Sequence, residues 1–309
     1  MTRALGEFAT NLSVDPITGI ATYSKDVIFG SNARIASPGA TSDSVANKGQ
    51  VDAASLLLVK GLFSNLKLSC SGTSAIVNIS VDEIVLQNPS NYKYYIARGV
   101  TQTVSTAVTG LGGLDTGVIA TGTWYSVWLV SDGTNLSTLI STSATAPTLP
   151  SGASGYVYRV RIGWIKTDGT ANKYPLYFQQ IGKRFRWKID SSTNNGNSLA
   201  FLFASGVQGS FATPTSLPVQ IRGVHIPSTA VAAYIWVSKD VSTSSAALVG
   251  TTNAPYTGGG LGCLTQFSSA PARIINVSIG ELLLESDYLY YIGDSAGAKT
   301  ICFGWEDNI

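Results

Sequence analysis

Residues 156–165 read YVYRVRIGWI, a run that alternates apolar and charged side chains as a half-buried β-strand does. Every second residue from Tyr158 to Trp164 would face one side of such a strand, and Arg159 and Arg161 would face the other. Similar short runs recur along the chain between turn signals such as Asp-Gly, and no helices alternate with them. The sequence therefore predicts a mainly β fold made of antiparallel β-sandwich-like units.

The 309 residues divide into four predicted parts. Residues 1–42 contain a hairpin signal, because the turn sequence DPITG separates two short apolar runs, but they have too few apolar positions for an independent core. Residues 43–60 are predicted to form a short helix that links this segment to the rest. Residues 61–182 and 183–309 are each predicted to form an antiparallel β-sandwich-like domain, with the break in the strand-like run IGKRFRWKI.

The predicted helix is the exception in a β-patterned chain. Its apolar residues fall at Val51, Ala54 and Leu58, a spacing of three and then four that places them on one helix face. Gly49 weakens the start of the helix. Such a face can pack against copies of itself in a bundle, or against the helix's own domain.

Composition excludes several classes of protein. Charged residues make up only 12% of the chain and the net charge is +2, which is too small to indicate a nucleic-acid partner. There is no apolar run of 18 residues and no signal-peptide core near the N-terminus, so no membrane insertion is expected. The three cysteines, Cys70, Cys263 and Cys302, are expected to be free thiols, with a Cys263–Cys302 disulfide as the alternative.

Catalytic and metal-binding patterns are weak. The single histidine, His225, rules out multi-histidine metal sites and is expected to be an ordinary strand residue rather than part of a catalytic triad. Asp115 begins an Asp-Thr-Gly triplet, which occurs once and is best explained as a tight turn rather than as half of an aspartic-protease site. Glu83 and Glu281 occupy matching places in two similar strand sequences, either as a hydrolytic pair or on the wet faces of their strands. We assign no catalytic residue, metal or cofactor.

The sequence KRFRWK at 183–188 offers a candidate binding surface. Arg184, Arg186 and Lys188 would lie on one face of a strand, with Phe185 and Trp187 on the other. Cations beside aromatic rings can hold acidic or phosphorylated sugars. The alternative is a strand between two domains with its apolar side turned inward.

Two aromatic runs, NYKYYI and DYLYYI, add candidates for contact with sugar rings. Aromatic residues at strand spacing are ordinary sandwich core, so most of them are expected to be buried. Tyr94 and Tyr290 fall on the off-core face of their strands and are the better surface candidates.

Two segments carry a resemblance to a known family. The segment PGATSDSVANKGQVDAA, with N-K-x-x-V-D at 47–52, resembles a linker of tailed-bacteriophage fibre proteins, although Gln50 stands where an aromatic residue is usual. The run GGLDTGVIATGTWYSVWLVSDGT, continued by LISTSATAPTLPSGASGYVYRVRIGWIKTDGT, resembles a β module of phage fibre and virion-decoration proteins. The resemblance covers about residues 38–60 and 61–170, and the C-terminal third of the chain rests on strand pattern alone.

The resemblance implies a structural virion protein without enzymatic activity, made in the host cytoplasm and assembled into the virion. It implies a homotrimer in which Val51, Ala54 and Leu58 line a three-helix bundle. Residues 1–42 would attach to a tail, collar or capsid protein, and the β-domains would bind host cell-surface polysaccharide. A head fibre or capsid decoration protein is the nearest alternative, and a glycan-depolymerising tailspike is the alternative from another class.

Overall fold

The computed structural model describes residues 12–14, 21–23, 60–188, 201–203, 219–239, 245–250, 263–268, 276–293 and 298–309. The chain divides into two compact units, Met1–Leu58 and Val59–Ile309.

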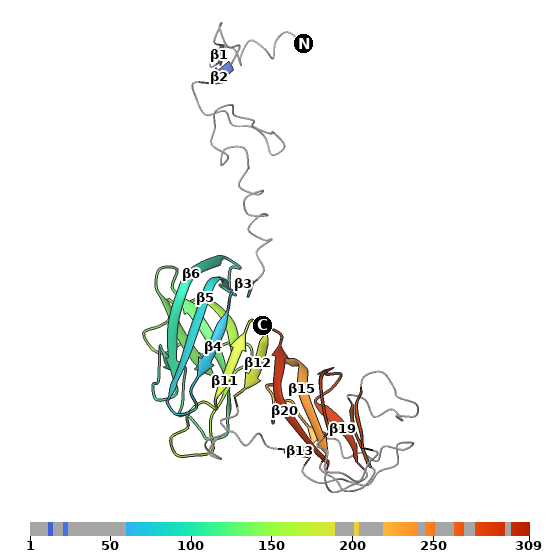
Figure 1. The fold of residues 1–309 in the computed structure, drawn as a ribbon. Coiled ribbons are helices and arrows are strands. Elements are labelled where there is room, and N and C mark those ends of the chain that lie inside the picture. The colour runs from blue at the N-terminus through green and yellow to red at the C-terminus, as the bar shows by residue number, and fades with distance from the viewer. Residues whose placement is uncertain are drawn as a thin grey trace. The chain divides into compact units, whose positions relative to one another are not determined.

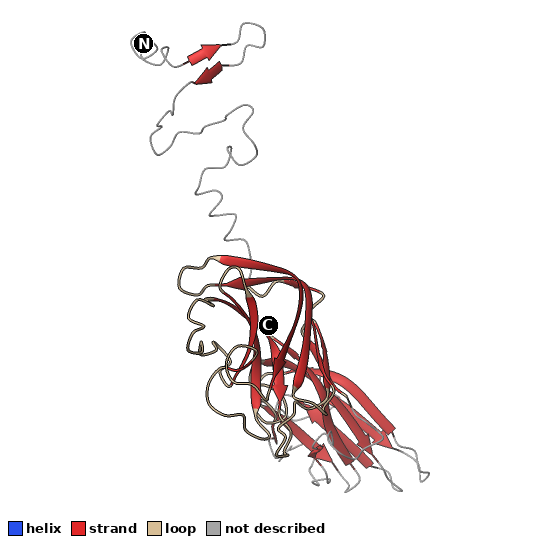
Figure 2. Ribbon diagram, turned by 90° about the vertical axis from the view of Figure 1, so that its left-hand side faces the viewer, coloured by secondary structure: helices blue, strands red, loops and turns tan. Residues whose placement is uncertain are grey.

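Among the described residues every regular element is a strand and none is a helix (Figure 2). The strands are β1 (Leu12–Val14), β2 (Ala21–Tyr23), β3 (Phe63–Ser64), β4 (Lys67–Cys70), β5 (Ile76–Gln87), β6 (Tyr94–Ser105), β7 (Gly113–Leu114), β8 (Trp124–Ser131), β9 (Leu136–Ser141), β10 (Tyr158–Lys166), β11 (Phe178–Ile181), β12 (Arg184–Trp187), β13 (Phe201–Phe203), β14 (Val219–Gln220), β15 (Ala230–Lys239), β16 (Ser245–Gly250), β17 (Cys263–Ser268), β18 (Asn276–Leu283), β19 (Tyr288–Gly293) and β20 (Ala298–Asp307). The predicted mainly β fold is confirmed.

The N-terminal unit contains the hairpin that the turn sequence DPITG predicts. Strands β1 and β2 pair antiparallel, with Val14 opposite Ala21 across the turn. Residues 43–59 of the predicted helix lie outside the described residues, as do Val51, Ala54 and Leu58 on its expected bundle face, and Lys60 lies in a turn.

The second unit is organised by one large sheet of 14 strands (Figure 1). Its main path runs β18-β15-β20-β12-β11-β4-β5-β10-β8-β9-β7, and β13, β3 and β6 pair at its sides. The sheet is mixed rather than purely antiparallel, because β7 pairs parallel to β9. A separate sheet of four strands has the order β14-β19-β16-β17.

The sheet packs against itself in the manner of a sandwich. Gly163 on β10 lies so close to the layer formed by β11 and β12 that a Cβ atom there would sit 2.8 Å from the Phe185 ring. The Gln180 side chain on β11 is fully buried and donates from Nε2 to the Ile162 carbonyl at 2.7 Å. Phe185 itself is fully buried, so the hydrophobic core lies between these two layers.

The sheet also continues through the predicted domain boundary. Strands β11 and β12 form a hairpin around Gly182, and β12 then pairs with β20 near the C-terminus. The boundary between residues 61–182 and 183–309 thus falls inside a hairpin of the large sheet, and the division into two domains stays a prediction.

The alternation expected in β10 holds for only part of the strand. The pairing of β10 with β8 shifts between Arg161 and Gly163, which makes Ile162 the extra residue of a β-bulge. Arg161 lies opposite Trp128 and Trp164 lies opposite Ser126, two residues away on β8. The bulge therefore places Trp164 on the same face as Arg161, not on the opposite face as the sequence pattern predicts.

Candidate functional site

The candidate surface on β12 is exposed as its alternation indicates. Arg184 and Arg186 are exposed, whereas Phe185 is fully buried and Trp187 is 8% exposed. Phe185 stacks on Trp305 with ring centroids 4.4 Å apart, which fixes the inner face of the strand. The strand thus holds two guanidinium groups outward from a rigid aromatic core.

Neighbouring strands extend this outer face in two rows. In the first row, Arg186 lies opposite Gln179 of β11 on one side and Gly304 of β20 on the other, and Gly304 lies opposite Tyr234 of β15. Residues opposite one another on paired strands share a face of the sheet. Gln179, Arg186 and Tyr234 therefore belong to one surface, contributed by strands that are far apart in sequence.

A bulge in β20 adds a second aromatic ring to this surface. The pairing of β20 with β15 shifts between Gly304 and Cys302, so Phe303 is the extra residue. Without the bulge, Phe303 would face the core with Trp305. Instead its ring stacks with that of Tyr234 at a centroid distance of 6.0 Å and an angle of 30°.

Arg186 lies over these two rings. Its Cζ atom is 5.6 Å from the Phe303 ring centroid and 6.0 Å from that of Tyr234. Gly304 makes this arrangement possible, because a Cβ atom there would lie 2.9 Å from the Tyr234 ring and 2.2 Å from the Phe185 carbonyl oxygen. The aromatic pair thus forms a floor beneath the guanidinium group, where a cation–π attraction orients it.

The second row carries charges of both signs. Arg184 lies opposite Glu306 of β20, and its Nε atom is 3.8 Å from Oε2 of that carboxylate. The side chain of Arg184 is 73% exposed, so solvent screens this pair and it adds little to stability. Burial, followed by Glu281 and Glu306, raises the pKa of Tyr234, which keeps its hydroxyl neutral beside the arginines.

The other predicted surface residues lie elsewhere. Lys188 is exposed at the end of β12, where its backbone N–H donates to the Tyr177 carbonyl at 2.9 Å. Tyr94 is half-buried on β6, and Tyr290 is half-buried on β19 in the separate four-stranded sheet. The structure brings Arg184 and Arg186 together with Tyr234 and does not bring Tyr94 or Tyr290 into the same row.

The Asp-Thr-Gly triplet forms the tight turn that the sequence predicts. The Asp115 carboxylate is 5% exposed and accepts hydrogen bonds from the backbone N–H groups of Thr116 at 2.7 Å and Thr148 at 2.8 Å. Gly117 takes a φ of +85°, a conformation that favours glycine. This carboxylate is occupied in holding two loops together.

The two glutamates of the similar strand sequences are not placed as a facing pair. Glu83 lies on β5 and accepts from Arg98 Nε at 2.7 Å, while Glu281 lies on β18 at the far end of the sheet path. Strands β15, β20, β12, β11 and β4 lie between them in that path. Glu83 is thus engaged by Arg98 on the half-exposed face of its strand.

His225 lies in a short turn after β14 rather than in a strand. Burial and then the nearby Lys166 charge lower its pKa to about 4, so the imidazole is neutral at neutral pH. The neighbouring Val224 carbonyl accepts from Lys166 Nζ at 2.7 Å and from Trp124 Nε1 at 3.3 Å. These bonds attach the turn to the first residue of β8, Trp124, and to the last residue of β10, Lys166.

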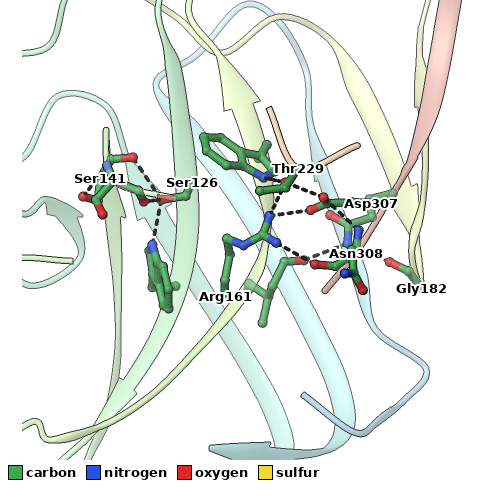
Figure 3. Close-up of polar contacts among 12 residues, drawn as sticks. Ser126, Ser141, Arg161, Gly182, Thr229, Asp307 and Asn308 are labelled. Carbon is green, nitrogen blue, oxygen red and sulfur yellow. Dashed lines mark hydrogen bonds and ion pairs between the residues drawn. The ribbon is translucent and has the colours of Figure 1, made fainter. Parts of the chain in front are cut away.

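A buried polar cluster, which the sequence analysis does not predict, fixes the C-terminal strand (Figure 3). Arg161 on β10 donates from Nη1 to Asp307 Oδ2 at 2.6 Å and to Thr229 Oγ1 at 2.8 Å, and from Nη2 to the Asn308 carbonyl at 2.6 Å. Trp164 Nε1 donates to the same Thr229 hydroxyl at 2.9 Å. Asp307 is fully buried, and its contacts with Arg161 join β10 to β20.

The thiols are as expected where the structure describes them. Cys70 and Cys302 are free and buried, and burial raises their pKa values to about 11 and about 12. The side chain of Cys263 lies outside the described residues. Within the described part of the chain, no cluster of three or more histidine, cysteine or acidic side chains has the proximity that a metal ion needs.

No protein-family model, curated protein or solved structure matches this chain. Over the described ranges, no helix has the length and apolar character needed to cross a membrane.

Proposed function

We propose that this chain is a structural fibre protein of a tailed-bacteriophage virion, which attaches by its N-terminal segment and binds host-surface glycan through its β unit. The observation that carries the proposal is the linker sequence with N-K-x-x-V-D at 47–52, followed by the β module whose sequence resembles phage fibre proteins. The division of the chain at Leu58 and Val59, at the end of that linker, agrees with an anchor followed by a separate β unit.

The proposed assembly is a homotrimer of 32.4 kDa chains, with Val51, Ala54 and Leu58 facing the threefold axis. The purified full chain should have the mass of a trimer in light scattering at micromolar concentration. A monomer under these conditions would contradict the fibre assembly, because a fibre of this type depends on the association of its three chains.

The proposed attachment uses residues 1–42, which carry a hairpin but too little apolar sequence for a core of their own. Segments of this kind complete their folding on a partner, here a tail, collar or capsid protein of the virion. Deletion of residues 1–42 should leave a folded trimer that binds cells and is absent from particles. Incorporation of the truncated chain at the normal level would refute the anchor assignment.

A map of virions that contain this chain would distinguish a tail fibre from a head fibre or capsid decoration protein. Incubation of the pure protein with host polysaccharide, followed by an assay for new reducing ends, tests the depolymerase alternative. Release of reducing ends by the wild-type chain would replace the binding function with an enzymatic one.

A further inference from the structure

We propose that the outer face of β4, β11 and β12 is a binding surface for a linear, carboxylate-bearing polysaccharide that lies across the strands. This inference rests on the proposed function and names the surface and the chemical class of the host glycan.

The surface consists of two parallel rows of side chains, which are exposed except for the half-buried Ser69. Ser69, Gln179 and Arg186 form the first row, since Gln179 is paired with both of the others across β4, β11 and β12. Lys67, Ile181 and Arg184 form the second row in the same way. The residues between the rows on each strand, such as Leu68, Gln180 and Phe185, are buried, so all six row residues belong to the outer face. We call these six residues the outer rows.

The chemistry of the outer rows matches an acidic sugar polymer. Lys67 on β4 and Arg184 and Arg186 on β12 supply three cations. The first carboxylates met when the rows are followed past β12 are Glu306 on β20, which is 3.8 Å from Arg184, and Glu281 on β18. A guanidinium held over aromatic rings keeps its in-plane N–H donors available to a carboxylate. The neutral Gln179 amide and Ser69 hydroxyl supply hydrogen bonds to sugar hydroxyls.

The geometry favours a linear ligand over a small anion. Adjacent strands lie about 4.8 Å apart, so the first row presents polar groups on three successive strands along a line perpendicular to them, and the second row presents Lys67 and Arg184 on either side of Ile181. A repeating polymer can occupy several such positions at once, and its weak contacts then add through effective concentration. Nucleic acid fits less well, because the chain has a net charge of only +2.

A subunit interface is the competing use of this face, since Ile181 is 58% exposed. Ile181 is however the only apolar member of the outer rows, and the interfaces of permanent oligomers are more apolar than ordinary surface. Phe303 and Tyr234 are covered by Arg186 rather than offered as an apolar patch.

The test measures binding of the full chain to immobilised polygalacturonate, with dextran sulfate and neutral dextran as parallel arms. We expect binding to polygalacturonate and none to neutral dextran, and we expect the affinity to fall as salt screens the charges. The Arg184→Gln/Arg186→Gln variant should bind at least tenfold more weakly. Lys93→Gln, an exposed cation in the loop before β6, is the matched control and should bind as the wild type does.

Two further variants separate a specific site from general attraction between charges. Arg186→Lys keeps the charge but loses the planar donor pair, and should weaken binding to polygalacturonate more than to dextran sulfate. Gln179→Ala leaves every charge in place and should weaken binding several-fold. The proposal would be overturned if Lys93→Gln lost as much affinity for polygalacturonate as the Arg184→Gln/Arg186→Gln variant. It would also be overturned if Gln179→Ala left that affinity unchanged.

The same variants distinguish this inference from the proposed function. If wild-type protein adsorbs to host cells and the Arg184→Gln/Arg186→Gln variant adsorbs equally well, the fibre function stands and this surface is wrong. If wild-type protein does not adsorb to host cells, the proposed function fails, even if the protein binds polygalacturonate. Conversion of the trimer to monomers by the double variant would make the face a subunit interface and would also overturn the inference.

Discussion

Replacement of Asp307 by alanine should destabilise the β unit far more than the loss of an equally short ion pair on the surface. The Asp307 carboxylate is fully buried and accepts from Arg161, from Thr229 and from the backbone N–H of Asn308. Its removal leaves a guanidinium whose side chain is 12% exposed without its counter-charge. Breaking a buried pair in this way costs about 3–5 kcal/mol.

The matched control is Arg98→Ala. The Arg98–Glu83 pair has an N–O distance of 2.7 Å, against 2.6 Å for Arg161–Asp307, but its side chains are 67% and 46% exposed. Screening by solvent limits such a pair to at most about 1 kcal/mol. The comparison therefore isolates burial, because the two contacts differ little in length.

Thermal unfolding followed by near-ultraviolet circular dichroism, with urea titration for the free energy, measures both variants. For a unit of this size, the loss at Asp307 corresponds to a fall in Tm of about 6–20 °C. Replacement of both partners, Arg161→Met with Asp307→Leu, should lower the free energy of unfolding less than Asp307→Ala alone, since it leaves no unpaired buried charge. A fall for Asp307→Ala no larger than that for Arg98→Ala would refute the reasoning.

Three further predictions follow from burial. Gly304→Ala places a Cβ atom 2.2 Å from a backbone oxygen and should cost about 1–3 kcal/mol in urea unfolding, whereas Gly169→Ala, which meets no heavy atom within 4 Å, should change stability by less than about 0.5 kcal/mol. The pKa of His225 is about 4 in the folded chain and 6.5 when unfolded, so the contribution of this residue to stability is complete above pH 6.5 and is lost as the pH falls toward 4. The Tm should therefore fall as the pH is lowered from 6.5 to 4, and the His225→Gln variant should show a smaller fall. The raised pKa values of Cys70 and Cys302 should make both thiols react with iodoacetamide near pH 8 only after unfolding, and rapid native-state labelling of either residue, located by peptide mapping so that Cys263 is scored separately, would contradict this.

Local patterns in the sequence predict the strands well because they depend on neighbouring residues. Alternation places Arg184 and Arg186 outward and Phe185 inward, as the structure has them. The hairpin around DPITG and the turn at Asp115 follow from residues that lie side by side in the chain. In each case the structure depends on interactions between residues a few positions apart, so it can be predicted from the local sequence.

Pairing between distant segments is a different matter. The joint between Arg161 and Asp307 links residues 146 positions apart, and the neighbours of Arg186 come from β11, β20 and β15. Alternation shows that each strand has two faces but does not show which strands are adjacent. Tyr234 and Phe303 were therefore not identified from the sequence as partners of Arg186.

Among the register shifts of the large sheet, those at Ile162 and Phe303 are each followed by a glycine, whereas the shift at Val231 is not. Ile162 precedes Gly163 and Phe303 precedes Gly304, and an isolated glycine inside a strand pattern is the one local hint of a bulge. Both glycines lie against Phe185, one at its ring and the other at its backbone carbonyl. A side chain at either position would therefore collide with Phe185, so both strands need a glycine where they approach it.

The position of the candidate surface follows from that packing. Phe185 is stacked between Phe178, at a centroid distance of 5.6 Å, and Trp305, at 4.4 Å, so β12 is held between β11 and β20 by its inner face. The next residue, Arg186, must then point outward, over the ring that the β20 bulge has turned to the same side. The bulge in β20 therefore places Phe303 under the guanidinium group, on the face opposite the stack of Phe185 on Trp305.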